Sequence, residues 1–136
     1  RADGEAGQLV TEHLSIPFYR IDEQMTSGEV IGVLSRMTAV VSMRLHGLIF
    51  AAGQGVPVVG ISYDPKVTAF LRCVDADCIR LEELEAGALC RLIDAAYARR
   101  SDAAALEENV RSLRAIEHRS RETAARLLGK EAGQDA

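Results

Sequence analysis

The fold is decided by residues 39–66, AVVSMRLHGLIFAAGQGVPVVGISYDPK. Ala39–Met43 is a short apolar run that stops at the polar sequence Arg44-Leu45-His46-Gly47. Leu48–Ala52 is apolar with small residues, and Pro57–Tyr63 is a second apolar run without polar alternation. Such a run is typical of a parallel strand that is covered on both faces. The stretch therefore predicts a strand, a helix and a second, parallel strand.

A cationic group follows each of these two strands. Asp64-Pro65 is a strong helix-start signal, since aspartate caps helices and proline suits the first helical position, and it places Lys66 in the first turn. Arg44 and His46 hold the equivalent place before the preceding helix. Cations are unfavourable at the positive end of a helix. An anion bound between these two strand-to-helix turns, which we call elbows, would remove the conflict. The alternative is that Lys66 pairs with Asp64 while Arg44 points to solvent. The spacing does not identify the anion.

The flanking sequence continues the alternation of strands and helices. A weak helix is expected over Gly7–Leu14. Further strands are predicted over Ile16–Ile21 and Asp77–Leu81, and helices over Glu29–Met37, Val67–Leu71 and Gly87–Arg99. Thr26 and Glu29 have the spacing of a capping box. The pattern predicts an α/β fold with a Rossmann-like parallel sheet flanked by helices, over residues 1–100.

The tail, residues 101–136, has a different character. Ser101-Asp102 is expected to cap a helix that runs to Leu128, with Gly129 as its stop and a disordered end over Gly133–Ala136. At 1.5 Å per residue this helix would be about 40 Å long, more than a domain of this size can cover. It offers a surface for oligomer formation, although its apolar seam lacks regular heptads.

Composition excludes several classes of function. The chain has 136 residues, 48% of them hydrophobic, and a net charge of −4, which argues against a nucleic-acid surface. No apolar run approaches the roughly 20 residues of a membrane span, and we expect a cytoplasmic protein. Cys73, Cys78 and Cys90 cannot all pair, and we expect them to be reduced and mostly buried. No metal site is indicated. The chain does not begin with methionine, which favours a segment of a longer protein.

Two motifs also resemble a known family. Residues 41–48, VSMRLHGL, and residues 55–66, GVPVVGISYDPK, resemble the polysaccharide pyruvyl transferases, including the bacterial cell-wall pyruvyl transferases. The resemblance extends more loosely from Ile16 to Leu92. It implies the C-terminal half of a two-domain GT-B-like enzyme, whose long C-terminal helix crosses back to an N-terminal domain encoded upstream.

The resemblance implies transfer of the enolpyruvyl unit of phosphoenolpyruvate to a sugar as a pyruvate ketal, without a cofactor. The acceptor would be a glycan or a lipid-linked sugar, reached at the inner face of the membrane. His46 and Lys66 occupy the positions associated with holding phosphoenolpyruvate, and His46 is also the candidate to move a proton. Arg44 would contact an oxyanion, while Gly47 and Tyr63 belong to the same substrate-binding motifs. Carboxylate acid/base residues would lie upstream, so residues 1–136 alone are expected to be inactive.

Two other functions remain open at this point. The first is the donor-binding domain of a GT-B nucleotide-sugar glycosyltransferase, although no convincing ribose-binding glutamate follows His46. The second is a non-catalytic module that binds a phosphorylated metabolite. His46 itself has a structural alternative, as a residue that caps the following helix. The acceptor sugar, the ketal stereochemistry and the oligomeric state cannot be read from these residues.

Overall fold

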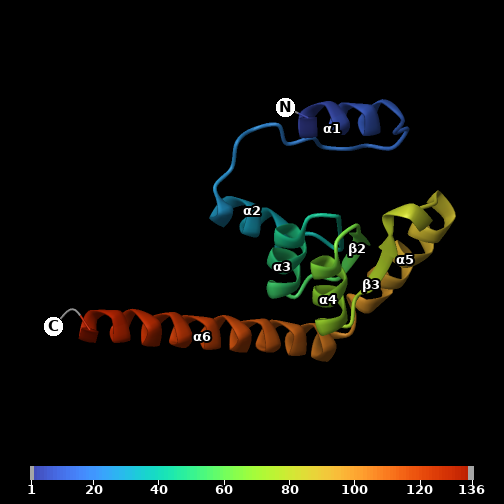
Figure 1. The fold of residues 1–136 in the computed structure, drawn as a ribbon. Coiled ribbons are helices and arrows are strands. Elements are labelled where there is room, and N and C mark those ends of the chain that lie inside the picture. The colour runs from blue at the N-terminus through green and yellow to red at the C-terminus, as the bar shows by residue number, and fades with distance from the viewer. Residues whose placement is uncertain (1, 135–136) are drawn as a thin grey trace.

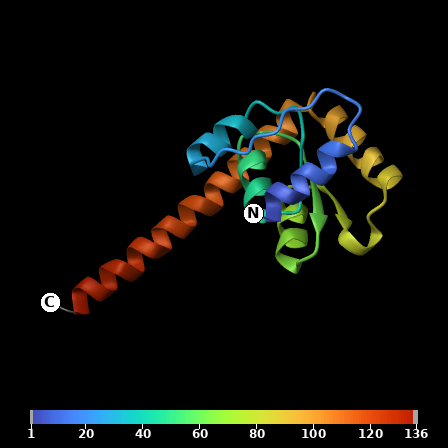
Figure 2. The ribbon, with the colours of Figure 1, turned by 90° about the horizontal axis from the view of Figure 1, so that it is seen from above.

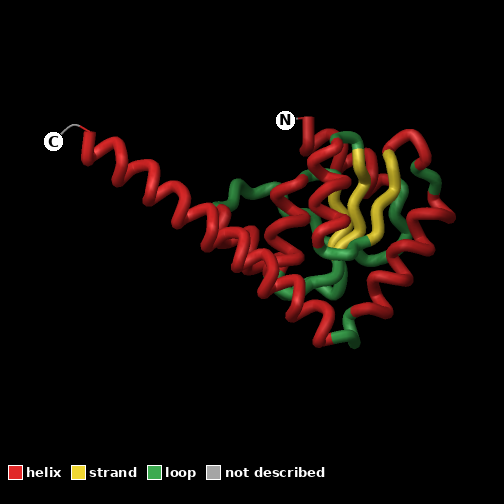
Figure 3. The backbone as a smooth tube through the Cα atoms, turned by 60° about the horizontal axis from the view of Figure 1, so that its bottom comes forward, coloured by secondary structure: helices red, strands yellow, loops and turns green. Residues whose placement is uncertain are grey.

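The computed structural model describes the backbone of residues 2–134 and the side chains of residues 4–119, 122, 125 and 126. Three parallel strands lie between helices (Figures 1 and 3). The elements in chain order are α1 (Ala2–Glu12), α2 (Ser27–Leu34), β1 (Val40–Ser42), α3 (Leu45–Gly53), β2 (Val58–Ser62), α4 (Pro65–Cys73), β3 (Asp77–Arg80), the 3-10 turn η1 (Leu81–Glu83), α5 (Ala86–Arg99) and α6 (Ala103–Gln134). The predicted α/β class with a parallel sheet and a long C-terminal helix is confirmed.

The sheet has the strand order β1-β2-β3, and its register is constant. Val40 of β1 pairs with Val58 of β2, and Ser62 of β2 pairs with Arg80 of β3. Every residue thus lies beside the residue 18 positions further along the chain. Because successive side chains in a strand alternate between the two faces, Val58 and Val59 point to opposite sides of the sheet.

Helices α3 and α4 cover one face and form the main core with it. The cluster comprises Val40, Leu48, Ala51, Ala52, Val56, Val58, Val67, Leu71 and Val74, all nearly or fully buried. Helix α5 packs on the other face, over β2 and β3, where Val59, Ile79 and Ala96 are buried. The Arg99 guanidinium of α5 donates to the Asp77 carboxylate of β3 at 2.6 Å. This ion pair fastens α5 to the edge of the sheet.

Helix α6 leaves the body of the molecule after its first turns (Figure 2). It packs on α3, and Leu113 lies against the core cluster. Asp102 accepts a hydrogen bond from the backbone N–H of Ala105 and so caps the helix as expected. None of the helices in the described part of the chain combines the length and apolar character that crossing a bilayer requires.

The helix-start predictions are confirmed. Thr26 and Glu29 form the expected capping box at α2, and the Asp64 carboxylate accepts from the backbone N–H of Lys66 at the start of α4. The strand predicted over Ile16–Ile21 is wrong, since the segment has no regular structure. It carries the branched and aromatic residues of a strand, but no neighbouring strand is present to satisfy its backbone groups. Figure 1 shows α1 and this segment set apart from the helices that flank the sheet.

Two further expectations are wrong. Helix α6 continues through Gly129 to Gln134, including Gly133, because a glycine inside a helix costs only about 1 kcal/mol and the residues after it favour the helix. Residues 135 and 136 lie outside the described residues. The cysteines are free as expected, but all three are exposed rather than buried. A core built on only three strands buries too few positions to include them.

Gly60 provides a direct test of this packing. A Cβ at position 60 would overlap Cδ1 of Leu71 and lie 2.9 Å from its Cδ2, because the Leu71 side chain of α4 packs directly on this position. Gly60→Ala should therefore lower the free energy of unfolding by about 1–3 kcal/mol, the usual cost of overpacking a core. Urea denaturation measures the change. Gly32→Ala, where a Cβ meets nothing within 4 Å, is the control and should leave stability equal or raise it. Equal losses in the two variants would contradict the proposed packing.

Candidate functional site

Two consecutive strand–helix units of this protein follow one plan with a period of 20 residues. Each strand ends in a serine, Ser42 or Ser62, which lies two residues before the N-cap residue of the next helix. The N-caps are Arg44 for α3 and Asp64 for α4. The second residues of the two helices, His46 and Lys66, are therefore structurally equivalent.

The two helices also end alike. After α3, the N–H of Gly55 donates to Ala52 and the N–H of Val56 to Ala51; after α4, Asp75 and Ala76 repeat the pattern with Arg72 and Leu71. Both ends are Schellman motifs, with the left-handed residue at Gly55 (φ 75°) and at Asp75 (φ 49°). At these helix ends the equivalent positions hold different residues, so it is the backbone geometry that shows that the two ends repeat.

The repeat places the two cations in a staggered arrangement. Strand partners are 18 residues apart while the repeat is 20, so Lys66 sits two residues further along the strand direction than His46, or about 6–7 Å. Helices α3 and α4 contact each other, and packed helices lie about 8–10 Å apart. The backbone positions of His46 and Lys66 are therefore on the order of 12 Å apart. Both side chains start from helix N-termini at the carboxyl edge of the sheet.

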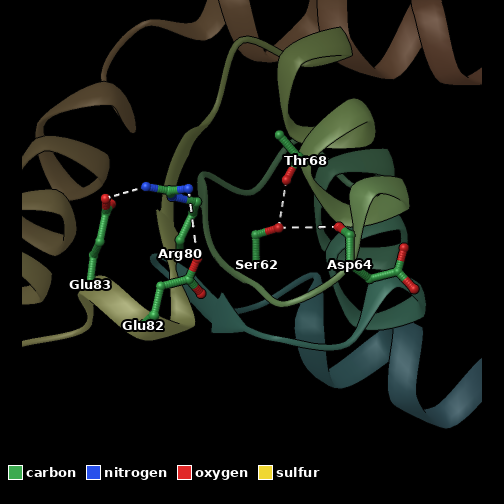
Figure 4. Close-up of polar contacts among 6 residues, drawn as sticks. All are labelled: Ser62, Asp64, Thr68, Arg80, Glu82 and Glu83. Carbon is green, nitrogen blue, oxygen red and sulfur yellow. Dashed lines mark hydrogen bonds and ion pairs between the residues drawn. The ribbon is translucent and has the colours of Figure 1, made fainter.

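Serine hydroxyls fix the two elbows. Ser42 Oγ accepts from the N–H of Arg44 at 3.0 Å and donates to its carbonyl at 3.2 Å. A Cβ on Gly47 would lie 3.1 Å from the same oxygen, so glycine at this position lets α3 start close to the end of β1. Ser62 Oγ donates to the carbonyl of Asp64 at 3.2 Å and lies 2.5 Å from the Thr68 hydroxyl (Figure 4). The elbows are thus tied to the strands by local hydrogen bonds.

The surroundings of the cations bear on the alternatives left open by the sequence. Asp64 bonds the backbone N–H of Lys66, and no ion pair or hydrogen bond engages the Lys66 side chain within the described part of the chain. Arg44 is exposed and makes no side-chain cap. The exposed His46 ring lies beside Phe50, with ring centroids 6.2 Å apart. Since Arg44 holds the N-cap position of α3, His46 is not the capping residue.

The glycines play different parts. Gly47 adjoins the elbow of α3, as described above, whereas Gly60 lies within β2 and accommodates Leu71. The absent side chain of Gly60 therefore makes room for the core and not for a ligand.

A cleft of about 400 Å³ lies on the side of α4 away from α3. It is lined by Ser62, Tyr63, Asp64, Pro65, Thr68, Ala69, Arg72, Arg80 and Glu82. Tyr63 is the one residue of the predicted site that lines it; Arg44, His46, Gly47 and Lys66 do not. Sequence reasoning missed Arg72 and Arg80. Arg72 lies about two helical turns after the motif, in α4, and Arg80 lies at the end of the next strand, β3. Arg80 reaches this edge of the sheet because it pairs with Ser62.

Arg80 is held in place by two glutamates (Figure 4). Its guanidinium donates to Glu83 at 2.5 Å and lies 3.7 Å from Glu82. The hydrogen bond to Glu83 and the attraction of both carboxylates raise the pKa of Arg80, and the same hydrogen bond lowers the pKa of Glu83. Among the described residues no group of histidine, cysteine and carboxylate side chains is arranged to hold a metal ion.

Comparison with known proteins places the first half of the chain in context. Residues 3–65 match the model of the polysaccharide pyruvyl transferase family, which confirms the family that the two motifs indicated. The matched part contains α1, α2, β1, α3 and β2 and ends at Pro65, one residue before Lys66. No curated protein and no solved structure matches the chain.

The cap at the second elbow can be tested directly. Asp64→Ala should lower the free energy of unfolding by about 0.5–2 kcal/mol, because the first turn of α4 loses the 2.7 Å bond to its backbone N–H. Asp64→Asn is the matched control, since asparagine caps helices about as well and only the charge is lost. Thermal or urea unfolding compares the two. If asparagine is as damaging as alanine, the role of Asp64 is electrostatic and the capping account fails.

Proposed function

We propose, on the premise that residues 3–65 match the polysaccharide pyruvyl transferases, that this chain binds phosphoenolpyruvate at the Arg44–His46–Lys66 edge for transfer of its enolpyruvyl unit to a sugar. The family match carries the proposal at the level of a transferase. The geometry supports it independently, since two equivalent helix starts present His46 and Lys66 along one edge of the sheet.

The stagger of the two cations suits a ligand with two separated anionic groups. Phosphoenolpyruvate carries a phosphate ester and a carboxylate, both attached to C2. Both helix N-termini add positive potential, which favours anions. We assign Lys66 to one anionic group and His46 to the phosphate, with Arg44 as a forked contact to either. Gly47 supports this edge by allowing α3 to begin close to β1.

The transfer requires proton movement and charge neutralisation. A proton is added to C3 of phosphoenolpyruvate while a sugar hydroxyl adds to C2 and gives up its own proton. Phosphate then leaves, and a second hydroxyl adds to the cation-like C2, which completes the ketal and releases another proton. In this proposal His46 protonates the departing phosphate or holds it, and Lys66 neutralises its charge. No cofactor enters this balance.

The wider organisation forms part of the same proposal. The chain would belong to the C-terminal half of a GT-B-like two-domain enzyme, with the carboxylate acid/base residues contributed by sequence outside residues 1–136. It would then bind the donor substrate without completing the transfer alone. The acceptor would be a sugar of a cell-surface polysaccharide, in keeping with the description of the matched family.

The affinity of a Lys66 variant for phosphoenolpyruvate tests the donor site. Lys66→Ala should weaken phosphoenolpyruvate binding by about 1.5–3 kcal/mol, the scale of a hydrogen bond to a charged group. Isothermal titration calorimetry on residues 1–136 measures the affinity. Arg91→Ala on α5, on the opposite face of the sheet, removes the same charge and should leave the affinity nearly unchanged.

His46→Ala separates binding from proton transfer in an active full-length protein. If His46 only holds phosphate, kcat/KM falls through weaker binding; if it moves a proton, kcat falls more than affinity. A UDP-sugar titration is the competing arm. Saturable UDP-sugar binding that Lys66→Ala weakens, together with no response to phosphoenolpyruvate, would replace the proposal with a glycosyltransferase donor site.

A further inference from the structure

The cleft between α4, the end of β3 and η1 is separate from the edge that carries His46 and Lys66. It opens on the opposite side of α4 from α3, and its volume of about 400 Å³ lies in the range of small-molecule sites. Its residues come from β2, α4, β3 and η1, so their juxtaposition depends on the fold. Among them, only Tyr63 belongs to the substrate-binding motifs that the sequence indicated.

The charges that line this cleft cancel. Arg72 and Arg80 are matched by Asp64 and Glu82, and Arg80 is further engaged by Glu83. An anion would therefore meet nearby carboxylates and a guanidinium that is already paired. A second phosphate-binding site is disfavoured here for that reason.

Most of the cleft lining is apolar, but the polar groups within it disfavour a ligand that is apolar throughout. The cleft contains the Ser62 and Thr68 hydroxyls, which are bonded to each other, and the Ser62 hydroxyl also donates to the Asp64 carbonyl. Its rim holds charged groups, and the structure places no hydrogen bond or ion pair on Arg72 within the described residues. Burying these groups against hydrocarbon without new hydrogen bonds would be costly. A suitable ligand must offer donors and acceptors of its own.

Tyr63 supplies an apolar surface at the same place. It follows β2 directly, is 58% exposed, and presents an aromatic ring with a polar tip at the rim of the cleft. A sugar ring has one face of C–H groups that packs on an aromatic ring and a rim of hydroxyls that bond to guanidinium and carboxylate groups. We propose that this cleft binds a neutral saccharide unit, with Tyr63 beneath the ring and Arg72, Asp64 and Glu82 bonding its hydroxyls.

This cleft and the proposed donor edge lie on either side of the N-terminal end of α4. Tyr63 and Lys66 belong to the same elbow, with Tyr63 on the cleft side of α4 and Lys66 in its first turn. A saccharide in the cleft would therefore lie next to a ligand held by Lys66. Its identification as the acceptor sugar rests on the proposed function, whereas saccharide binding itself does not.

The test is an NMR titration of the ¹⁵N-labelled chain with a panel of methyl β-glycosides, those of glucose, galactose, mannose and their N-acetylamino counterparts. At least one should shift the amides of Tyr63, Thr68 and Arg80 and the Arg72 side-chain N–H in a saturable manner. Tyr63→Ala should weaken this binding about threefold to tenfold, while Tyr63→Phe keeps it. Tyr97→Ala is the matched control, because Tyr97 is also half-exposed but stacks under Arg100 on α5.

Arg72→Ala provides a second variant that removes no packed side chain, and it should also weaken binding. The proposal is overturned if no glycoside shifts these resonances, if Tyr63→Ala and Tyr97→Ala bind equally, or if inorganic phosphate produces the same shifts. A parallel phosphoenolpyruvate titration keeps the two hypotheses apart. If glycosides bind and phosphoenolpyruvate does not, the saccharide hypothesis is supported and the donor-site hypothesis is contradicted. If phosphoenolpyruvate binds and glycosides do not, the donor-site hypothesis is supported and the saccharide hypothesis is contradicted.

Discussion

The structure depends on the packing of two successive helices against one face of a sheet with a constant register. Each paired residue of β1 and β2 lies beside the residue 18 positions further along the chain, whereas the strand–helix unit repeats after 20 residues. The difference of two residues steps each helix start further along the strand direction. Gly60 lets α4 pack closely on β2, since Leu71 of α4 occupies the space where a side chain at position 60 would stand. The positions of His46 and Lys66 follow from this arithmetic.

Local hydrogen bonds fix the backbone of the two elbows. Ser42 and Ser62 hold the backbone of the residue two places on, and Asp64 caps the second helix. These backbone contacts of the elbows do not involve the side chains of His46 and Lys66. Positive helix ends that carry further positive groups are energetically unfavourable without an anion. The proposed function assigns phosphoenolpyruvate as that anion.

Much of this was predictable from sequence because it depends on local signals. The apolar runs, the capping box of Thr26 and Glu29, and Asp64-Pro65 each specify their own backbone geometry. The strand expected at Ile16–Ile21 failed because strand formation requires a partner, which local propensity does not reveal. The 20-residue repeat was missed because Ser42 and Ser62 are among the few identical residues at equivalent positions, while most of those positions differ, as at His46 and Lys66. The cleft was missed since Arg80 reaches it only through pairing with Ser62.

The most direct test of the central claim is whether His46 and Lys66 respond to one bound anion. An NMR titration of the labelled chain with phosphoenolpyruvate follows the His46 ring and the Lys66 side-chain resonances together. We predict that both move along one isotherm with a single dissociation constant, and that Lys66→Ala weakens the response of His46. Shifts of one residue without the other, or two isotherms with different constants, would contradict a shared site.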